Sequence, residues 1–304
     1  MQTASDSVRR ARPLLGTLVE IEVAGAMRAH MEAAIEAAFE AVAKVHDLMS
    51  FHKHDSDVAR LNAGAWRQPV PVHAWTYRVL QTAAELLARS NGAFDVGIAP
   101  VLQRLGVLPR ARNEFQAPPS RIEMGKGIKL LPEKCVSFSH PGVRIDLGGI
   151  AKGFAVDRAI EVLQTFAMPN GLVNAGGDLA QFGSRPEKIH IRDPLDPRRL
   201  LCSIEVENQA LASTGRCFDA FLPEKAGGAA VIDPASGAMS TAAAGATVRA
   251  ASCVIADALT KIVMIAGTDT SKLLDDYQAD ALLVSLSGEI RLTAKLQSAV
   301  CLAA

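Results

Sequence analysis

Apolar residues recur at helical spacing in several stretches of the chain, and these stretches predict its main helices. The clearest one covers residues 28–50, where a single face is formed by Met31, Ile35, Phe39, Val42, Val45 and Met49. Residues 150–166 form a second, and further helices are predicted over residues 72–90 and 269–277. Residues 252–266 are apolar around most of the helix circumference, so we expect this helix to be buried.

Shorter apolar or alternating runs predict strands. They cover residues 17–23, 128–131, 136–139, 143–147, 172–175, 188–192, 200–206, 210–214, 246–250, 281–286 and 290–293. The three runs between residues 188 and 214 suggest an antiparallel meander. Residues 104–123 contain prolines and many charges and read as a surface excursion. Since strands resume on both sides of it, we predict one domain over residues 1–304.

Residues 142–178 read as a strand, a glycine turn, a helix and a second strand. The turn is Gly148-Gly149, and glycine lets a backbone approach a ligand closely because it has no Cβ. Asp146 and Lys152 flank this turn, and the helix N-terminus that follows carries a partial positive charge suited to phosphate. The turn is therefore either an anion-binding site or an ordinary turn with a surface ion pair.

The predicted helix over residues 252–266 carries a second polar cluster. Asp257 and Lys261 are an acid–base pair four residues apart, and Thr260 lies beside them. On a helix that is buried, charged groups must be paired or must bind a ligand. The cluster is thus either a structural ion pair or part of a pocket.

Composition narrows the class of protein. The 304 residues carry a formal net charge of zero, and there is no basic stripe of the kind that binds nucleic acid. Five scattered cysteines with no CxxC pair indicate thiols in a reducing compartment. The N-terminus lacks the apolar run of a signal peptide, and no segment is long and apolar enough to span a membrane. These features predict a cytoplasmic protein, or a periplasmic one if a leader has been removed.

Several motifs together resemble the FAD:protein FMN transferase family, also called the ApbE family, over nearly the whole chain. They are Leu15-Gly16-Thr17; Met49-Ser50 through Ser56 to Arg60-Leu61-Asn62; Gly92-Ala93-Phe94-Asp95; Asp146 to Gly153, read DLGGIAKG; Asn174-Ala175-Gly176-Gly177-Asp178; Ile232-Asp233-Pro234-Ala235-Ser236-Gly237; and Ala256-Asp257-Ala258-Leu259. Each motif alone is weak, and their order along the chain makes the combination specific.

The resemblance implies an α+β fold with mixed and largely antiparallel sheets, packed helices and a deep FAD cleft, in an ApbE-like (T-fold-like) architecture. It implies an enzyme that binds FAD and, with a divalent cation such as magnesium, transfers FMN to a threonine of an acceptor protein. The FAD contacts would be Leu15, His52, Ala93, Phe94, Asp95, Asp146, Gly148, Gly149, Lys152, Asp178 and Ile232. Gly149, Asp257 and Thr260 would hold the metal, and Asp257 and Lys261 would be catalytic.

Three positions depart from the family pattern. Lys261 stands where the family has a second helix ligand, a threonine, so its ammonium can take the place of the cation. Ala230 stands where the family has a histidine, and His52 stands where a tyrosine stacks on the flavin. The alternative function is therefore an FAD-binding homologue without transfer, either an FAD carrier or a slow FAD pyrophosphatase. The acceptor and the oligomeric state stay open.

Overall fold

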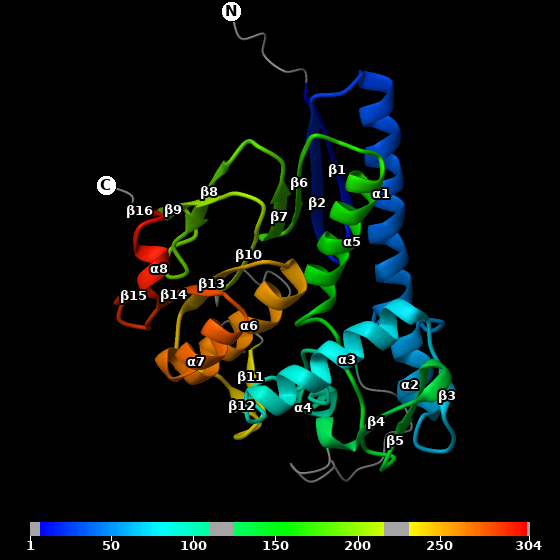
Figure 1. The fold of residues 1–304 in the computed structure, drawn as a ribbon. Coiled ribbons are helices and arrows are strands. Elements are labelled where there is room, and N and C mark those ends of the chain that lie inside the picture. The colour runs from blue at the N-terminus through cyan, green and yellow to red at the C-terminus, as the bar shows by residue number, and fades with distance from the viewer. Residues whose placement is uncertain (1–6, 110–123, 216–230, 303–304) are drawn as a thin grey trace, which may run out of the picture.

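A computed structural model describes residues 7–109, 124–215 and 231–302 of the protein. Its centre is an eight-stranded sheet in the order β1-β2-β6-β7-β10-β13-β14-β15, in which every neighbouring pair is antiparallel (Figure 1). The strands are β1 (Ser7–Leu14), β2 (Thr17–Ala24), β6 (Asn170–Ala175), β7 (Asp178–Phe182), β10 (Ala210–Gly215), β13 (Gly245–Ala250), β14 (Asp280–Val284) and β15 (Ile290–Leu292). With the packed helices, this sheet confirms the α+β class.

Three helices cover one face of the large sheet: α1 (Arg28–Met49), α5 (Ala151–Thr165) and α6 (Cys253–Ala266). All six apolar residues of the predicted α1 stripe are buried, which confirms that stripe as the packing face. The prediction that α6 is buried is also confirmed, since its sequence places apolar residues on nearly every side and most of them lie inside. These three helices share one core with the strands that they cover, and helices in residues 57–64 and 74–89 belong to the same core.

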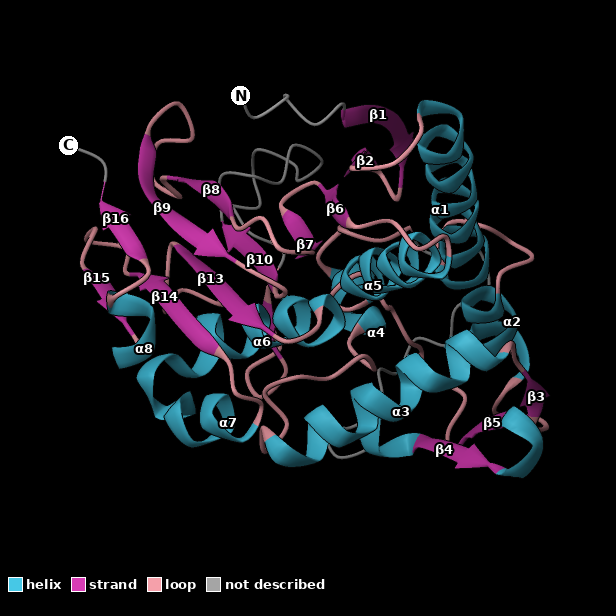
Figure 2. Ribbon diagram, turned by 45° about the horizontal axis from the view of Figure 1, so that its top comes forward, coloured by secondary structure: helices cyan, strands magenta, loops and turns pink. Residues whose placement is uncertain are grey.

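A small sheet covers part of the other face. It consists of β8 (Glu187–Arg192), β9 (Leu200–Val206) and β16 (Val300–Leu302), with α8 (Ala294–Gln297) beside it (Figure 2). The predicted meander is wrong in its last step, because β10 pairs with β7 and β13 of the large sheet instead of β9. The reason is burial: most of β10 is enclosed, and only the large sheet offers it neighbours on both sides.

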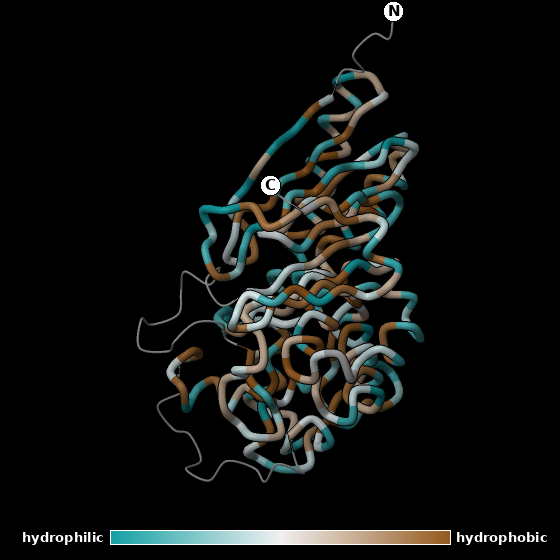
Figure 3. The backbone as a smooth tube through the Cα atoms, turned by 90° about the vertical axis from the view of Figure 1, so that its left-hand side faces the viewer, coloured by the Kyte–Doolittle hydropathy of each residue, from teal (hydrophilic) through white to brown (hydrophobic). Residues whose placement is uncertain are grey.

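A group of shorter elements lies at the end of the large sheet where α5 begins. They are α2 (Asp57–Gly64), α3 (Ala74–Arg89), α4 (Ala99–Arg104), and the sheet of β3 (Val70–Pro71), β5 (Cys135–Phe138) and β4 (Ile128–Leu131). The hairpin of β11 (Ile232–Asp233) and β12 (Ala238–Met239) packs near α4, and α7 (Ser271–Asp276) follows α6. Stretches of hydrophobic and hydrophilic colour alternate along the stacked strands in Figure 3.

Residues 143–147 do not form the predicted strand. Only Arg144 makes a bridge, to Ile98. The segment is held by a side chain: the Asn62 amide accepts from the Ile145 N–H at 2.7 Å and donates to its carbonyl at 2.9 Å. The Asp146 N–H donates to the Val96 carbonyl at 2.9 Å. These bonds satisfy the backbone in place of a sheet partner and fix the approach to the glycine turn.

No helix within the described residues is long and apolar enough to cross a membrane.

Candidate active site

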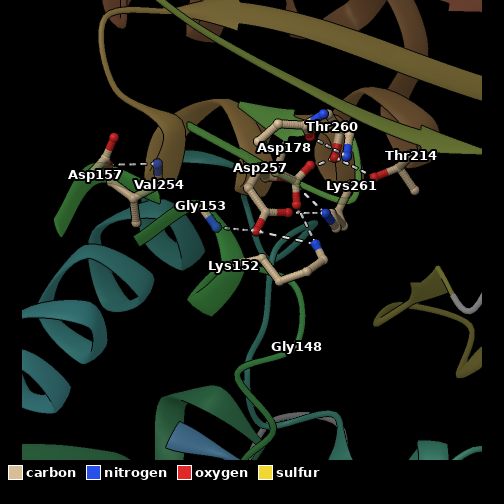
Figure 4. Close-up of polar contacts among 12 residues, drawn as sticks. Gly148, Lys152, Gly153, Asp157, Asp178, Thr214, Val254, Asp257, Thr260 and Lys261 are labelled. Atoms are coloured by element: carbon tan, nitrogen blue, oxygen red, sulfur yellow. Dashed lines mark hydrogen bonds and ion pairs between the residues drawn. The ribbon is translucent and has the colours of Figure 1, made fainter. Parts of the chain in front are cut away.

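Four charged side chains from three elements meet at the N-terminal end of α5. Lys152 comes from the first turn of α5, Asp178 from the start of β7, and Asp257 and Lys261 from α6. We refer to these four residues as the charged cluster. Lys152 Nζ forms an ion pair with Asp178 and lies 3.8 Å from Asp257 Oδ2, while Lys261 Nζ pairs with Asp257 Oδ1 (Figure 4). The structure thus joins the two motifs that the sequence left separate.

The aspartate side chains of the cluster are more deeply buried than its lysine side chains. The side chains of Asp257 and Asp178 are 0% and 1% exposed, whereas those of Lys152 and Lys261 are 30% and 17% exposed. Asp257 Oδ2 also accepts the Gly153 N–H at 3.0 Å. Buried carboxylates therefore anchor two lysines whose side chains are only partly buried.

The electrostatics of the cluster follow from this arrangement. Burial opposes ionisation of Asp257, but Lys152, Lys261 and the Gly153 N–H outweigh it, so the pKa of Asp257 is lowered. Burial and the neighbouring Asp257 raise the pKa of Asp178 against the attraction of the lysines. Burial works against the charge of Lys152, and the two aspartates more than compensate, so its pKa is raised. Lys152 is therefore cationic at neutral pH.

Gly153 and Asp157 fix α5 against α6, and sequence reasoning assigned neither of them a role. A Cβ at Gly153 would overlap the Cys253 carbonyl and lie 2.8 Å from the Cβ of Asp257, so only glycine permits this approach. Asp157 accepts the N–H groups of Cys253 at 2.7 Å and Val254 at 2.9 Å, which caps the first turn of α6. The signal in the sequence that could have identified them is their spacing, since Gly153 and Asp157 lie one helical turn apart on α5.

The Gly148-Gly149 turn lies beside the cluster. A methyl group added at Gly149 would lie 3.6 Å from Lys261 Cε and 3.8 Å from Phe94 Cε2, so these predicted site residues surround one point. The Asp146 carboxylate accepts the Gly148 N–H at 3.0 Å. Burial raises the pKa of Asp146, and the nearby His52 partly offsets this. The structure therefore brings the glycine turn, Phe94 and the cluster together.

Other predicted FAD contacts support loops. Asp95 accepts the N–H groups of Gly97 at 2.6 Å and Gly125 at 3.0 Å, and burial raises its pKa. Ile232 is buried in β11 against a small cluster of apolar residues next to α4. Asp95 thus stabilises the neighbouring loops through hydrogen bonds, and Ile232 stabilises β11 through apolar packing.

Leu15 and Ala93 are half-buried at turns. Leu15 has a φ of 57° in the tight β1–β2 turn, and Ala93 follows the left-handed pair that ends α3. Ala230 lies outside the described residues.

Two of the three predicted metal ligands, Asp257 and Thr260, already interact with other groups of the protein. Both carboxylate oxygens of Asp257 already face protein donors. The Thr260 hydroxyl is buried, donates to the Asp257 carbonyl at 2.7 Å and lies 2.8 Å from the Thr214 hydroxyl. Among the described residues, no group of three or more His, Cys, Asp or Glu side chains could hold a metal. The residues present therefore do not fit the cation that the family pattern implies.

The predicted deep FAD cleft stays a prediction. A cavity of about 510 Å³ lies by β9 and β16, and its lining includes Glu205, Arg249 and Cys301 but none of the predicted FAD contacts.

Comparison with known proteins places these motifs in a family. The family model described as the ApbE family matches residues 15–284. An FAD:protein FMN transferase of Haemophilus influenzae is 31% identical over 265 residues, which cover 81% of this chain and 76% of that protein. One of Vibrio cholerae is 28% identical over 237 residues, with 74% and 71% covered.

The same relationship is seen in three dimensions. The crystal structure of the ApbE protein of Thermotoga maritima superposes with a TM-score of 0.84 at 26% identity, over 97% of this chain and 99% of that one. The family match runs through the β1–β2 turn, the glycine turn, the start of β7 and α6, which are the elements that build the site. This chain belongs to the ApbE family.

Proposed function

We propose that this protein is an FAD:protein FMN transferase. The observation that carries the proposal is the charged cluster. Its lysines, Lys152 and Lys261, form ion pairs with buried aspartates and lie beside the Gly148-Gly149 turn. Two fixed ammonium groups next to a turn without side chains suit the negatively charged pyrophosphate of FAD. Membership of the ApbE family, whose relatives in two bacteria carry this name, supports the same activity.

The proposed reaction is a phosphoryl-type transfer. The hydroxyl oxygen of an acceptor threonine attacks the phosphorus on the FMN side of the FAD pyrophosphate. The bond from that phosphorus to the bridging oxygen breaks, AMP leaves with the bridging oxygen, and a base takes the hydroxyl proton. Such a transfer depends on positioning and on neutralising phosphate charge, since the protein makes no covalent bond itself.

Within this proposal the residues have distinct roles. Lys152, together with the N-terminal turn of α5, would hold the pyrophosphate, because an ammonium group and a helix N-terminus both favour anions. Asp146 would orient the nucleotide, and Phe94 would pack against the ligand next to Gly149. Asp178 would act indirectly, since its carboxylate fixes Lys152.

The first test compares binding and transfer. Purified protein is titrated with FAD and with FMN, and FAD should bind more tightly because Lys152 is placed for a pyrophosphate. Lys152→Ala should weaken FAD binding by about ten- to a hundredfold, the effect of losing one charge-assisted bond worth about 1.5 to 3 kcal/mol. Lys188→Ala, in β8 beyond the site, is the matched control and should bind FAD as the parent does.

Transfer is measured with a purified flavoprotein acceptor of one of the transferase relatives. Covalent FMN should appear on it by mass spectrometry with one AMP released per FMN attached, and none should appear when the target threonine is replaced by alanine. FAD binding with AMP release but no attached FMN would instead identify an FAD pyrophosphatase. Binding without either product would identify an FAD carrier.

A further inference from the structure

Both carboxylate oxygens of Asp257 already interact with groups of the protein. Lys261 Nζ pairs with Oδ1 and lies 3.0 Å from the Asp257 carbonyl, while Oδ2 accepts from Gly153 and faces Lys152 at 3.8 Å. A hard divalent cation needs carboxylate oxygens that are available as ligands. Here every side-chain oxygen of the buried acid already has a donor.

The second observation concerns charge. The cluster contains two carboxylates and two ammonium groups, so it is formally neutral without any bound ion. A divalent cation beside Asp257 would meet Lys152 and Lys261 at short range, where like charges repel strongly because little water screens them. Binding it would require Lys261 to leave its carboxylate, and the cost of that separation is high in a buried site.

The third observation is the position of Lys261. Its aliphatic chain runs past Gly149, close enough that an added methyl group there would touch it, while Thr260 points instead to Thr214 on β10. The Lys261 side chain, which is 17% exposed, therefore reaches from beside the glycine turn to the Asp257 carboxylate. Positive charge is thus already fixed where the family pattern expects a metal.

We propose that Lys261 is the fixed cation of this site, so that the protein binds the pyrophosphate of FAD without a divalent metal. The part that concerns FAD rests on the proposed function, whereas the part that concerns metal binding does not. The lysine contributes one positive charge on a covalent tether, and it stays in place whatever the metal concentration. The preferred ligand of the site is therefore a pyrophosphate group without a bound metal ion, and not a metal–pyrophosphate complex.

The experiment compares the full-length parent with Lys261→Thr and with Lys272→Thr, an exposed lysine on α7 that serves as the matched control. Magnesium binding is measured without FAD, by calorimetric titration and by the shift in melting temperature. FAD binding is then measured by flavin fluorescence in a chelator and in saturating magnesium. Lys261→Gln, which keeps a hydrogen-bond donor for Asp257 without the charge, replaces the threonine variant if that variant does not fold.

The parent and Lys272→Thr should show no saturable magnesium binding, and their FAD affinity should change by less than about twofold between chelator and magnesium. Lys261→Thr should gain magnesium binding and should bind FAD at least tenfold more tightly with magnesium than with chelator. Saturable magnesium binding by the parent would overturn the proposal. So would parent FAD binding that depends on magnesium, or a Lys261→Thr variant that binds no magnesium.

The two proposals fail in different ways. If the parent binds neither FAD nor magnesium while Lys261→Thr gains magnesium binding, the cation assignment stands and the transferase function is wrong. If FAD binds and is transferred only with magnesium, the function stands and the assignment of Lys261 is wrong.

Discussion

Asp157 shows how one side chain on a helix can set the position of another helix. Its two carboxylate oxygens accept the first free N–H groups of α6, the helix that carries Asp257 and Lys261. Burial raises the pKa of Asp157 to about 6 in spite of these two donors. The proton is therefore held more tightly in the folded protein than in the unfolded chain, where an aspartate titrates near its ordinary value of about 4.

This shift predicts a pH dependence of stability. Because the folded state binds the proton more tightly, the contribution of Asp157 to the free energy of unfolding is largest below pH 4 and falls as pH rises through about 6. Asp157→Asn removes the titration and keeps one acceptor. The free energy of unfolding, measured with urea between pH 4 and pH 7, should therefore fall in the parent by up to about 3 kcal/mol more than in the variant. Parallel curves for the two proteins would show that Asp157 does not titrate in this range.

The sequence predicted which residue types belong to the site better than it predicted which residues pair with one another. The Asp257–Lys261 pair was predictable because four residues of helix bring two side chains together. The addition of Lys152 and Asp178 was not predictable, since it depends on how β7 packs against α5 and α6. The contact of Asp95 with FAD stays a prediction, and the sequence did not predict that its carboxylate also accepts the N–H groups of Gly97 and Gly125.

Among the elements, the contact of α5 with α6 decides whether the cluster can assemble. The contact is closest at Gly153, where a Cβ would lie 2.6 Å from the Cys253 carbonyl carbon. Gly149, only one turn earlier, has ordinary contact distances of 3.6 and 3.8 Å around an added methyl and a φ outside the left-handed region. The two glycines therefore serve different purposes, although one motif contains both.

This contrast predicts opposite results for two alanine substitutions. Gly153→Ala should lower the free energy of unfolding by about 1 to 3 kcal/mol, the usual cost of overpacking, even though alanine ordinarily favours a helix interior by about 1 kcal/mol. Gly149→Ala should change it by less than about 1 kcal/mol. Chemical denaturation of both variants beside the parent measures the difference. Equal stabilities for the two variants would mean that α5 and α6 can separate without cost.

Element prediction succeeded where burial follows a simple period and failed where it does not. α1, α5 and α6 were found because each buries a defined face or its whole surface. β1 was missed because Val8 is the only fully buried residue in it. Residues 143–147 were taken for a strand because apolar and polar residues alternate in them, but their backbone bonds go to the Asn62 side chain and to the Val96 carbonyl and not to a neighbouring strand.

A single apolar core joins the large sheet to the shorter elements around α2 and α3. Val19 and Val173 in the sheet belong to the same buried cluster as Leu61 and Leu80. This supports the proposal that residues 1–304 form one domain. One domain was predicted because strands resume on both sides of residues 104–123, whereas the pairing of β10 and the small sheet of β8, β9 and β16 depended on contacts between distant segments.

One core predicts one unfolding transition. Both tryptophans, Trp66 and Trp75, lie in the α2–α3 part, so their fluorescence reports that part, while far-UV circular dichroism reports the whole chain. Urea titrations followed by the two signals should give the same midpoint and slope, because a two-state domain unfolds as a unit. A separate, earlier midpoint for the tryptophan signal would divide the chain into two domains.

β1, which the hydrophobic pattern did not predict, also disfavours self-association of the protein. β1 is an edge of the large sheet, and an uncovered edge exposes backbone groups that can pair with another chain. Arg9, Arg10 and Arg12 are exposed along it and pair with glutamates of its own protomer, and Pro13 lacks an N–H. Charge and proline make this edge a poor template for amyloid-like growth, and a strand with a regular apolar period would have lost that protection.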